Sequence, residues 1–275
     1  MPGSASDVAA QAALRYPMPA VLYELLSLNE AVPGAMSALP GIIRQDAELA
    51  KQMAIVSRGP GPWRDRTADR SMETALAALG FRRVHSAALL ITTIKTLPIE
   101  TTAFDYIVFW RYSVAVAYLA TSLAYSRRVE GREYAYVAGL FHDLGRLILE
   151  ESDPKGLSIV RTIQLRGDIP WHEVERSAFG FTALDVSLEL ARVWRLPQPL
   201  VDAIAGLVER RRSPLAGVLR DAGLAARALQ FATQNGRRQN LSPETATLID
   251  RYYEGPVGLR LRVDALLETS MIAPE

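Results

Sequence analysis

Apolar residues recur along most of the chain at spacings of three and four positions, the period of an amphipathic helix. Strand signals are scarce, because no Asn-Gly or Asp-Gly turn is bracketed by alternating apolar residues. The pattern therefore predicts an all-α protein. Helices are expected over residues 20–28, 34–45, 47–56, 71–80, 81–97, 104–128, 132–150, 154–165, 170–178, 182–194, 199–210, 214–233, 242–253 and 258–271.

Turn and cap residues divide these helices. Asp46 is a good N-cap, because its carboxylate can accept from the free amides of the next helix. Residues 57–70 hold two prolines, two glycines and four arginines, a composition typical of a loop. Residues 101–105 form a predicted joint. It divides the chain into an N-terminal helical subdomain, 1–100, and a second helical subdomain, 101–275, which together form one unit.

Composition narrows the function classes. The chain has 275 residues, 49% of them hydrophobic, and a net charge of +1, which gives no electrostatic case for binding nucleic acid. It has no cysteine, so disulfides and thiolate metal sites are excluded. No secretory leader pattern opens the sequence, and the most apolar run, 113–125, is shorter than a membrane span. These features favour a cytoplasmic protein with a buried core helix.

The candidate chemistry centres on His142 and Asp143, which are adjacent in the stretch AYVAGLFHDLGRLIL. His142 is one of three histidines in the chain. An adjacent His and Asp can share one cation only if other helices supply the remaining ligands, because a catalytic metal generally needs at least three protein ligands. A glycine-rich phosphate loop is absent: GPGPWRD, residues 59–65, contains prolines that remove the amide donors such a loop requires.

The chain from about Tyr16 to Thr233 resembles the HD-related output domain (HDOD) family of bacterial signalling proteins, a divergent branch of the HD metal-dependent phosphohydrolases. The segments that carry the resemblance, in order, are YPMPAVLYELLSL, IIRQDAELAKQM, SMETALAALGFRRVHSAAL, FWRYSVAVAYLATSLA and AYVAGLFHDLGRLIL. The resemblance implies a multi-helix HDOD or HD-like bundle.

Departures from the HD pattern bear on activity. The resemblance places Tyr112 where HD hydrolases carry their first metal-binding His, and Ala226 where they carry their last Asp. A shift of register could recruit Asp221 instead. The additional histidines of binuclear enzymes would fall at Ala183 and at positions 207–208, which are not His. Of four core ligands, the remnants are His142 and Asp143, so the resemblance implies no catalytic residue, no bound metal and no cofactor.

A polar network of protein side chains is the hypothesis that replaces the metal. Tyr112 could hydrogen-bond His142, and Arg146 lies one helical turn from His142, where its guanidinium could approach Asp143. Buried polar groups need partners, which would account for the pair without catalysis.

Other residues suggest weaker candidates. The loop with Trp63, Arg64 and Arg66 has a composition common at interfaces, and it is the predicted partner-contact loop. Residues 210–212 are a short basic run, more typical of a solvated helix end. His85 is more typical of a partly buried or surface His than of a switch. His172 with Glu173 and Glu175 lacks a third helix for metal binding.

These observations favour a non-catalytic signal-transduction module that contacts a sensor, receiver, cyclase or phosphodiesterase partner, as in a response regulator pathway; a homodimer is left open. Two alternatives stay open. One is a residual metal-dependent phosphohydrolase or cyclic-nucleotide phosphodiesterase. The other is a regulatory module that binds a nucleotide without hydrolysis.

Overall fold

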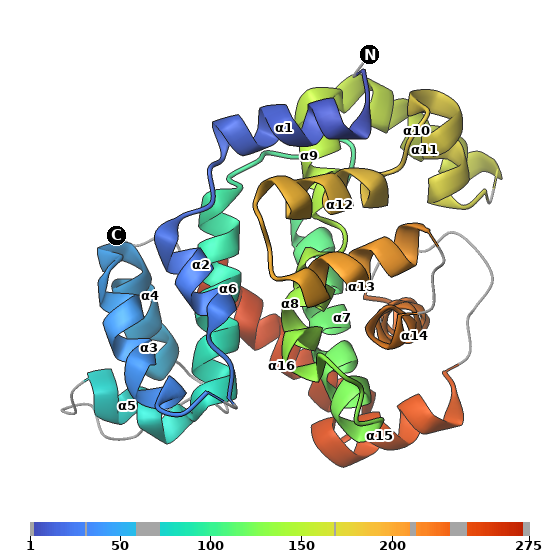
Figure 1. Ribbon diagram of the computed structural model, residues 1–275. Helices are drawn as coiled ribbons and strands as arrows, with labels where there is room; N and C mark the ends of the chain where they lie inside the picture. Colours follow the sequence, from blue (N-terminus) through green and yellow to red (C-terminus); the bar gives the residue numbers. More distant parts are fainter. Residues whose placement is uncertain are drawn as a thin grey trace. The chain divides into compact units, whose positions relative to one another are not determined.

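The computed structural model describes residues 3–30, 32–58, 72–167, 169–209, 213–231 and 241–271. These residues form helices joined by short connections, with no strand in the described ranges, so the predicted all-α class is confirmed (Figure 1). The chain divides into two compact units. The first comprises Met1–Pro17 with Ile99–Arg260, and the second comprises Met18–Pro98 with Leu261–Glu275. The predicted subdomains were 1–100 and 101–275. In the structure the N-terminal residues Met1–Pro17 group with the first unit, and the C-terminal residues Leu261–Glu275 group with the second.

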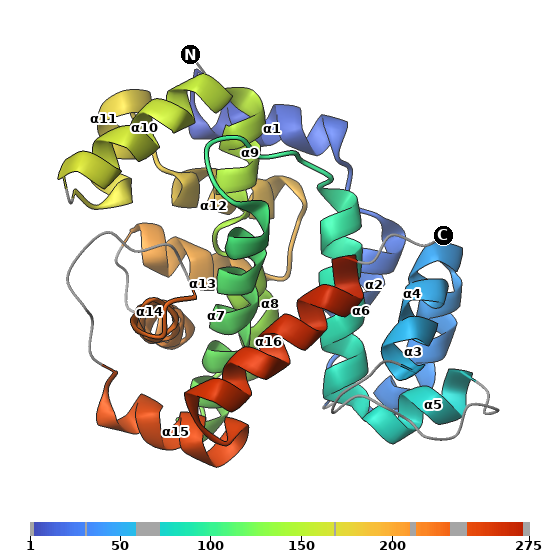
Figure 2. The ribbon, with the colours of Figure 1, turned by 180° about the vertical axis from the view of Figure 1, so that it is seen from behind.

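The first unit is built around α7, Tyr106–Ser126, whose side chains are largely buried. Helices α8 and α14 pack against it and lie beside it in both views (Figures 1 and 2). The other elements of this unit are α1 Ala5–Arg15, η1 Arg132–Tyr134, α8 Ala135–Phe141, α9 Leu144–Ser152, α10 Pro154–Gly167, α11 Trp171–Phe179, α12 Ala183–Val193, α13 Gln198–Val208, α14 Pro214–Ala228, α15 Pro243–Tyr253 and the first residues of α16 Gly255–Met271. The N-terminal helix α1, which packs on α12, was not predicted.

Among the described residues, α7 alone is long and apolar enough to cross a membrane by length and composition. Most of its apolar window is buried inside the protein, as expected for a core helix. A close crossing with α8 contributes to this burial. A Cβ on Gly139 would lie 2.5 Å from the Ala117 Cα, so glycine is required there for the two backbones to approach.

The predicted single helix over 132–150 is wrong: the chain breaks at His142 and Asp143, between α8 and α9. Asp143 leaves the helical region, with φ −114° and ψ 13°. The break frees first-turn amides of α9, and Ser187 of α12 satisfies one of them, since its Oγ accepts from the Gly145 amide at 2.8 Å. A Cβ on Gly145 would lie 2.0 Å from the Ala183 carbonyl oxygen, so α9 and α12 meet here without a side chain between them.

The second unit contains α2 Ala20–Ser27, α3 Ala35–Arg44, α4 Ala47–Arg58, α5 Met72–Leu79, α6 Phe81–Thr96 and the rest of α16. The predicted cap is confirmed, because the Asp46 carboxylate accepts from the amides of Glu48 and Leu49 at 2.9 and 3.0 Å. The His85 Nε2 donates to the Leu25 carbonyl at 2.7 Å and the ring stacks on Phe81. Burial lowers the pKa of His85, so this ring ties α6 to α2 in its neutral form.

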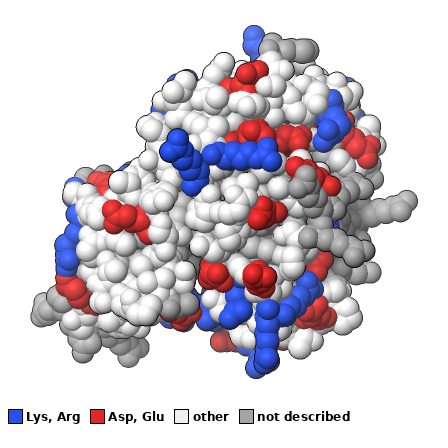
Figure 3. All heavy atoms as spheres, viewed as in Figure 1, with Lys and Arg blue, Asp and Glu red and all other residues white. Residues whose placement is uncertain are grey.

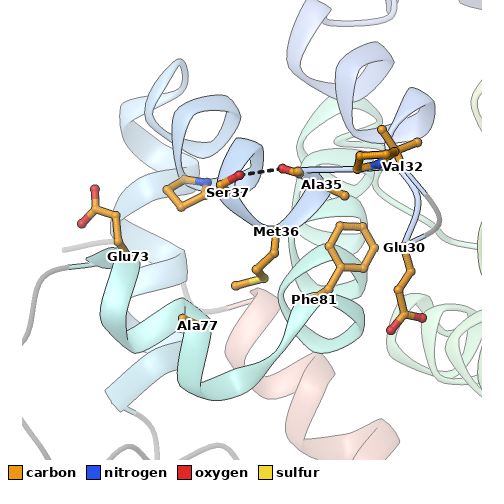
Figure 4. A pocket seen from close by; sticks show the side chains of 11 residues that line it. Glu30, Val32, Ala35, Met36, Ser37, Glu73, Ala77 and Phe81 are labelled. Carbon is orange, nitrogen blue, oxygen red and sulfur yellow. Dashed lines mark hydrogen bonds between the residues drawn. The ribbon is translucent and has the colours of Figure 1, made fainter.

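A groove of about 790 Å³ lies on the second unit between the residues before α3 and helices α5 and α6. Figure 4 shows Met36 and Phe81 in its middle and the carboxylates of Glu30 and Glu73 at its two ends. Each carboxylate is paired with an arginine: Glu30 with Arg82 at 2.6 Å, and Glu73 with Arg44. The groove is therefore apolar with a charge-balanced rim.

Candidate functional site

His142 and Asp143 lie at the break between α8 and α9, and both are buried. The His142 Nδ1 donates to the Gly139 carbonyl at 2.7 Å, one turn back along α8. This bond fixes the ring orientation and leaves Nε2 as the nitrogen with the lone pair in the neutral form. Burial lowers the pKa of His142, because it penalises the charged imidazolium.

The Asp143 carboxylate is held by Arg146. The Arg146 Nε donates to Oδ2 at 2.9 Å and one terminal nitrogen donates to Oδ1 at 3.2 Å, a two-point pairing. Both side chains are largely buried, with 11% of Asp143 and 17% of Arg146 exposed. Local geometry makes the pair easy to form, since residues three apart across the start of a helix face the same side. Both carboxylate oxygens of Asp143 are thus engaged by one protein cation.

Glu175 of α11 extends this pairing. Its Oε1 accepts from Arg146 at 3.1 Å and its Oε2 accepts from the Ala183 amide at 3.0 Å. The side chain is 2% exposed. Trp171, on the same helix, stacks its ring over the Arg146 guanidinium at 4.5 Å. Arg146 therefore links α9 to α11 through the Glu175 carboxylate and the Trp171 ring.

Tyr112 of α7 lies on the other side of His142, with ring centroids 5.7 Å apart. The predicted hydrogen bond between Tyr112 and His142 is not formed. The Tyr112 hydroxyl instead accepts from Arg227 of α14 at 2.6 Å. Gly223 makes room for this bond, since a Cβ there would lie 3.1 Å from the hydroxyl oxygen. The hydrogen bond from the charged Arg227 guanidinium to the Tyr112 hydroxyl was not predicted from the sequence.

These six side chains form the polar network: Tyr112, His142, Asp143, Arg146, Glu175 and Arg227. Burial shifts the pKa of several members. It raises the pKa of Tyr112 and of Glu175, and Arg146 partly opposes the second shift. The carboxylates of Asp143 and Glu175 raise the pKa of Arg146 despite its burial, so the guanidinium stays charged. Two carboxylates and two guanidinium groups balance one another within the network.

The structure thus brings together Tyr112, His142, Asp143 and Arg146. The loop residues Trp63, Arg64 and Arg66, and the basic run 210–212, lie outside the described residues. His172 is exposed at the start of α11, away from the network's bonds. Glu175 and Arg227 were missed as partners. Glu175 carries a signal in retrospect, because it occupies an inward position of an amphipathic helix beside buried Val174.

The residues at the HD pair do not fit a catalytic metal. Asp143 has both oxygens in the pairing with Arg146, and the position across from His142 holds a phenol that is bonded to a second guanidinium. Within the described ranges, His, Asp and Glu side chains nowhere gather in a group of three that could hold a metal ion. The alternative ligand Asp221 is engaged by Arg127 at 2.7 Å, about four helical turns along α7 from Tyr112.

A family model for the HDOD domain matches residues 16–208. The chain belongs to the HDOD family. Among curated proteins, an uncharacterized protein of Treponema pallidum (strain Nichols) is 23% identical over 192 residues, which covers 68% of this chain and 36% of that protein. This HDOD chain therefore spans about a third of the length of the curated relative it matches.

Solved structures share the fold at low identity. An HDOD domain protein of unknown function from Geobacter sulfurreducens matches with TM-score 0.76 and 17% identity, covering 95% of this chain and 97% of that one. A proposed signal transduction protein from Marinobacter aquaeolei VT8 has TM-score 0.67 and 20% identity, covering 97% and 65%. A proposed phosphohydrolase from Shewanella amazonensis SB2B has TM-score 0.63 and 19% identity, covering 96% and 97%. The helical fold is therefore shared with an HDOD domain protein, with a proposed signal transduction protein and with a proposed phosphohydrolase.

Proposed function

We propose that this HDOD protein is a non-catalytic regulatory module of bacterial signal transduction that acts in the cytoplasm through protein–protein contacts. The observation that carries the proposal is the two-point pairing of Asp143 with Arg146. An HD hydrolase uses such an aspartate as a metal ligand, whereas here a protein cation occupies its carboxylate. His142 and Asp143 then serve to connect helices.

Electrostatics supports this role. The carboxylates of Asp143 and Glu175 both pair with the Arg146 guanidinium, and the Arg227 guanidinium bonds to the Tyr112 hydroxyl beside His142. A divalent cation at Asp143 would have to compete with the Arg146 guanidinium, which is largely buried and also pairs with Glu175. Removing Arg146 from Asp143 would break both hydrogen bonds of the two-point pairing. The network is therefore poorly suited to take up a metal on demand.

The comparisons support a place in signalling at the level of the family. HDOD membership, together with a similarly folded proposed signal transduction protein, favours a regulatory role. The surface agrees with a protein partner, because acidic and basic side chains are interspersed over the face in Figure 3, and the net charge is +1. A nucleic-acid binder would instead present a basic stripe. The similarly folded proposed phosphohydrolase makes hydrolysis the alternative to test.

A hydrolysis assay separates the two functions. Purified protein is incubated with nucleotides and cyclic dinucleotides in the presence of added manganese, and His142→Ala serves as the matched control after its fold has been checked by circular dichroism. We expect both proteins to give the same rate as buffer alone. Turnover by the wild-type protein that disappears in His142→Ala would replace the regulatory proposal with a phosphohydrolase.

A further inference from the structure

Helix α10, Pro154–Gly167, leaves large apolar side chains in solvent. Its inner face buries Leu157 and Val160. On the opposite face Ile159 is 60% exposed and Ile163 is 43% exposed, at the i, i+4 spacing that places both on one side of a helix. Contiguous exposed apolar surface that is rimmed by polar groups can mark an interaction site.

The orientation of α10 is fixed by its inner contacts, so this face cannot turn inward. A Cβ on Gly156 would lie 2.9 Å from the Phe179 ring of α11, which shows how closely the two helices pack. The Asp153 carboxylate caps the first turn by accepting from the Gly156 amide at 2.8 Å. Arg161 anchors the middle of the helix, because its guanidinium donates to the Ala103 carbonyl at 2.5 Å.

The charges on the outer face have one sign. Lys155 and Arg166 lie within about 40° of Ile159 around the helix axis and bracket the isoleucines over roughly 16 Å. The helix sequence PKGLSIVRTIQLRG contains no Asp or Glu. Lys155 and Arg166 are both exposed, and neither forms an ion pair with a described residue, so both are open to the carboxylates of a partner. The face thus combines an apolar centre with two unpaired cations at its ends.

We propose that the outer face of α10, defined by Lys155, Ile159, Ile163 and Arg166, docks an acidic amphipathic helix of a signalling partner protein. This proposal rests on the proposed function, because it assumes that the protein acts through a protein partner. It adds the surface that the partner contacts and the chemistry of the partner's helix. Two leucine-like residues one turn apart on the partner would cover the isoleucines, and flanking carboxylates would meet the two cations.

A second copy of this chain fits the same face poorly. In a two-fold contact the same patch meets itself, so an antiparallel arrangement places Lys155 against Arg166 of the other copy, and a parallel one places each cation against itself. Like charges facing one another oppose association. Two cations are also fewer than nucleic-acid or membrane binding generally requires, since those rely on clusters of Lys and Arg.

The test selects helix-forming peptides that bind to the intact protein. A display library of helix-forming peptides with randomised polar and apolar positions is panned on the wild-type protein, and the enriched peptides are titrated by fluorescence anisotropy. The variants are Ile159→Asp and the double reversal Lys155→Glu with Arg166→Glu. Leu14→Asp, at a position 85% exposed on α1, is the matched control for adding an acid to an exposed apolar site. All substitutions lie on the surface, and thermal unfolding verifies that each variant is folded.

We expect the enriched peptides to carry Asp or Glu beside an apolar i, i+4 pair. Their Kd should rise at least about tenfold in Ile159→Asp and in the double reversal, and stay within about twofold in Leu14→Asp. Enrichment of basic peptides, or binding that is insensitive to both α10 variants, would overturn the proposal. The proposal is also overturned if the wild-type protein binds no peptide but self-associates in sedimentation or binds phosphatidylglycerol vesicles, and Ile159→Asp abolishes that association or binding. None of these outcomes depends on the hydrolysis assay, so the two proposals can fail separately.

Discussion

Replacing Arg146 by methionine removes the guanidinium that joins Asp143 to Glu175 while keeping an unbranched side chain against Trp171. The pairings lost are those at 2.9 and 3.2 Å to Asp143 and at 3.1 Å to Glu175. The variant leaves two carboxylates in a region where little water can compensate them, since Asp143 is 11% and Glu175 2% exposed.

The expected loss of stability follows from this burial. Removing one partner of a buried ion pair costs about 3–5 kcal/mol, because an uncompensated charge stays behind. Asp143 keeps some contact with solvent and Glu175 keeps its hydrogen bond from the Ala183 amide, so the lower end applies. We expect the free energy of unfolding to fall by about 3 kcal/mol at pH 7.5.

The loss should depend on pH in a definite direction. Burial raises the pKa of Glu175, and Arg146 opposes that rise, so the variant should raise this pKa further. A carboxyl whose folded pKa lies above its unfolded value contributes stability below the unfolded pKa and loses it as the pH rises through the folded one. The deficit of Arg146→Met should therefore shrink between pH 7.5 and pH 5, by up to about 1.4 kcal/mol per pH unit for one carboxyl.

Urea unfolding followed by circular dichroism at both pH values measures these differences. Arg192→Met is the matched control, because Arg192 pairs with Glu189 on the surface with 47% of its side chain exposed, and should change stability by less than about 0.5 kcal/mol. Adding Glu175→Gln to Arg146→Met should restore at least about 1 kcal/mol. A loss below about 1 kcal/mol that is the same at both pH values would refute the network as a buried ion pair.

Three further outcomes are expected. Tyr112→Phe removes the hydroxyl that accepts from Arg227 at 2.6 Å and should lower the free energy of unfolding by about 1–2 kcal/mol in a urea titration. Gly145→Ala brings a Cβ onto the Ala183 carbonyl and should lower the melting temperature severely, whereas Gly217→Ala, with open space around the added carbon, should leave it unchanged or raise it. Because burial lowers the pKa of His85, the wild-type protein should lose stability as the pH falls below about 6.5, and His85→Gln should lose less over the same urea titrations from pH 7.5 to pH 5.

The helices themselves were largely predictable, because apolar spacing and caps such as Asp46 are local signals. The break at His142 and Asp143 was not, since the apolar period continues through it in LFHDLGRLIL. What interrupts the helix is tertiary: the Gly145 amide is satisfied by Ser187 of α12, and the two backbones meet without a side chain between them. A pattern along one segment carries no information about such a partner.

The candidate site shows the same limit. The approach of the Arg146 guanidinium to Asp143 could be predicted, because Arg146 lies one helical turn from His142 in the sequence. The partner of Tyr112 was not, because choosing Arg227 over His142 depends on how α14 crosses α7 beside Gly223. Glu175 likewise reaches the network from a helix about thirty residues away in sequence. The contact between residues close in sequence could be predicted from helix geometry. The pairs between residues far apart in sequence could be identified only from the folded structure.

Metal content tests most directly whether protein side chains have replaced the cation at His142 and Asp143. The wild-type protein is incubated with manganese, iron(II) and magnesium in turn, dialysed extensively and analysed by inductively coupled plasma mass spectrometry, with His142→Ala treated in parallel. We expect far less than one metal per chain, with no difference between the two proteins. Stoichiometric metal in the wild-type protein that is lost in His142→Ala would contradict the account.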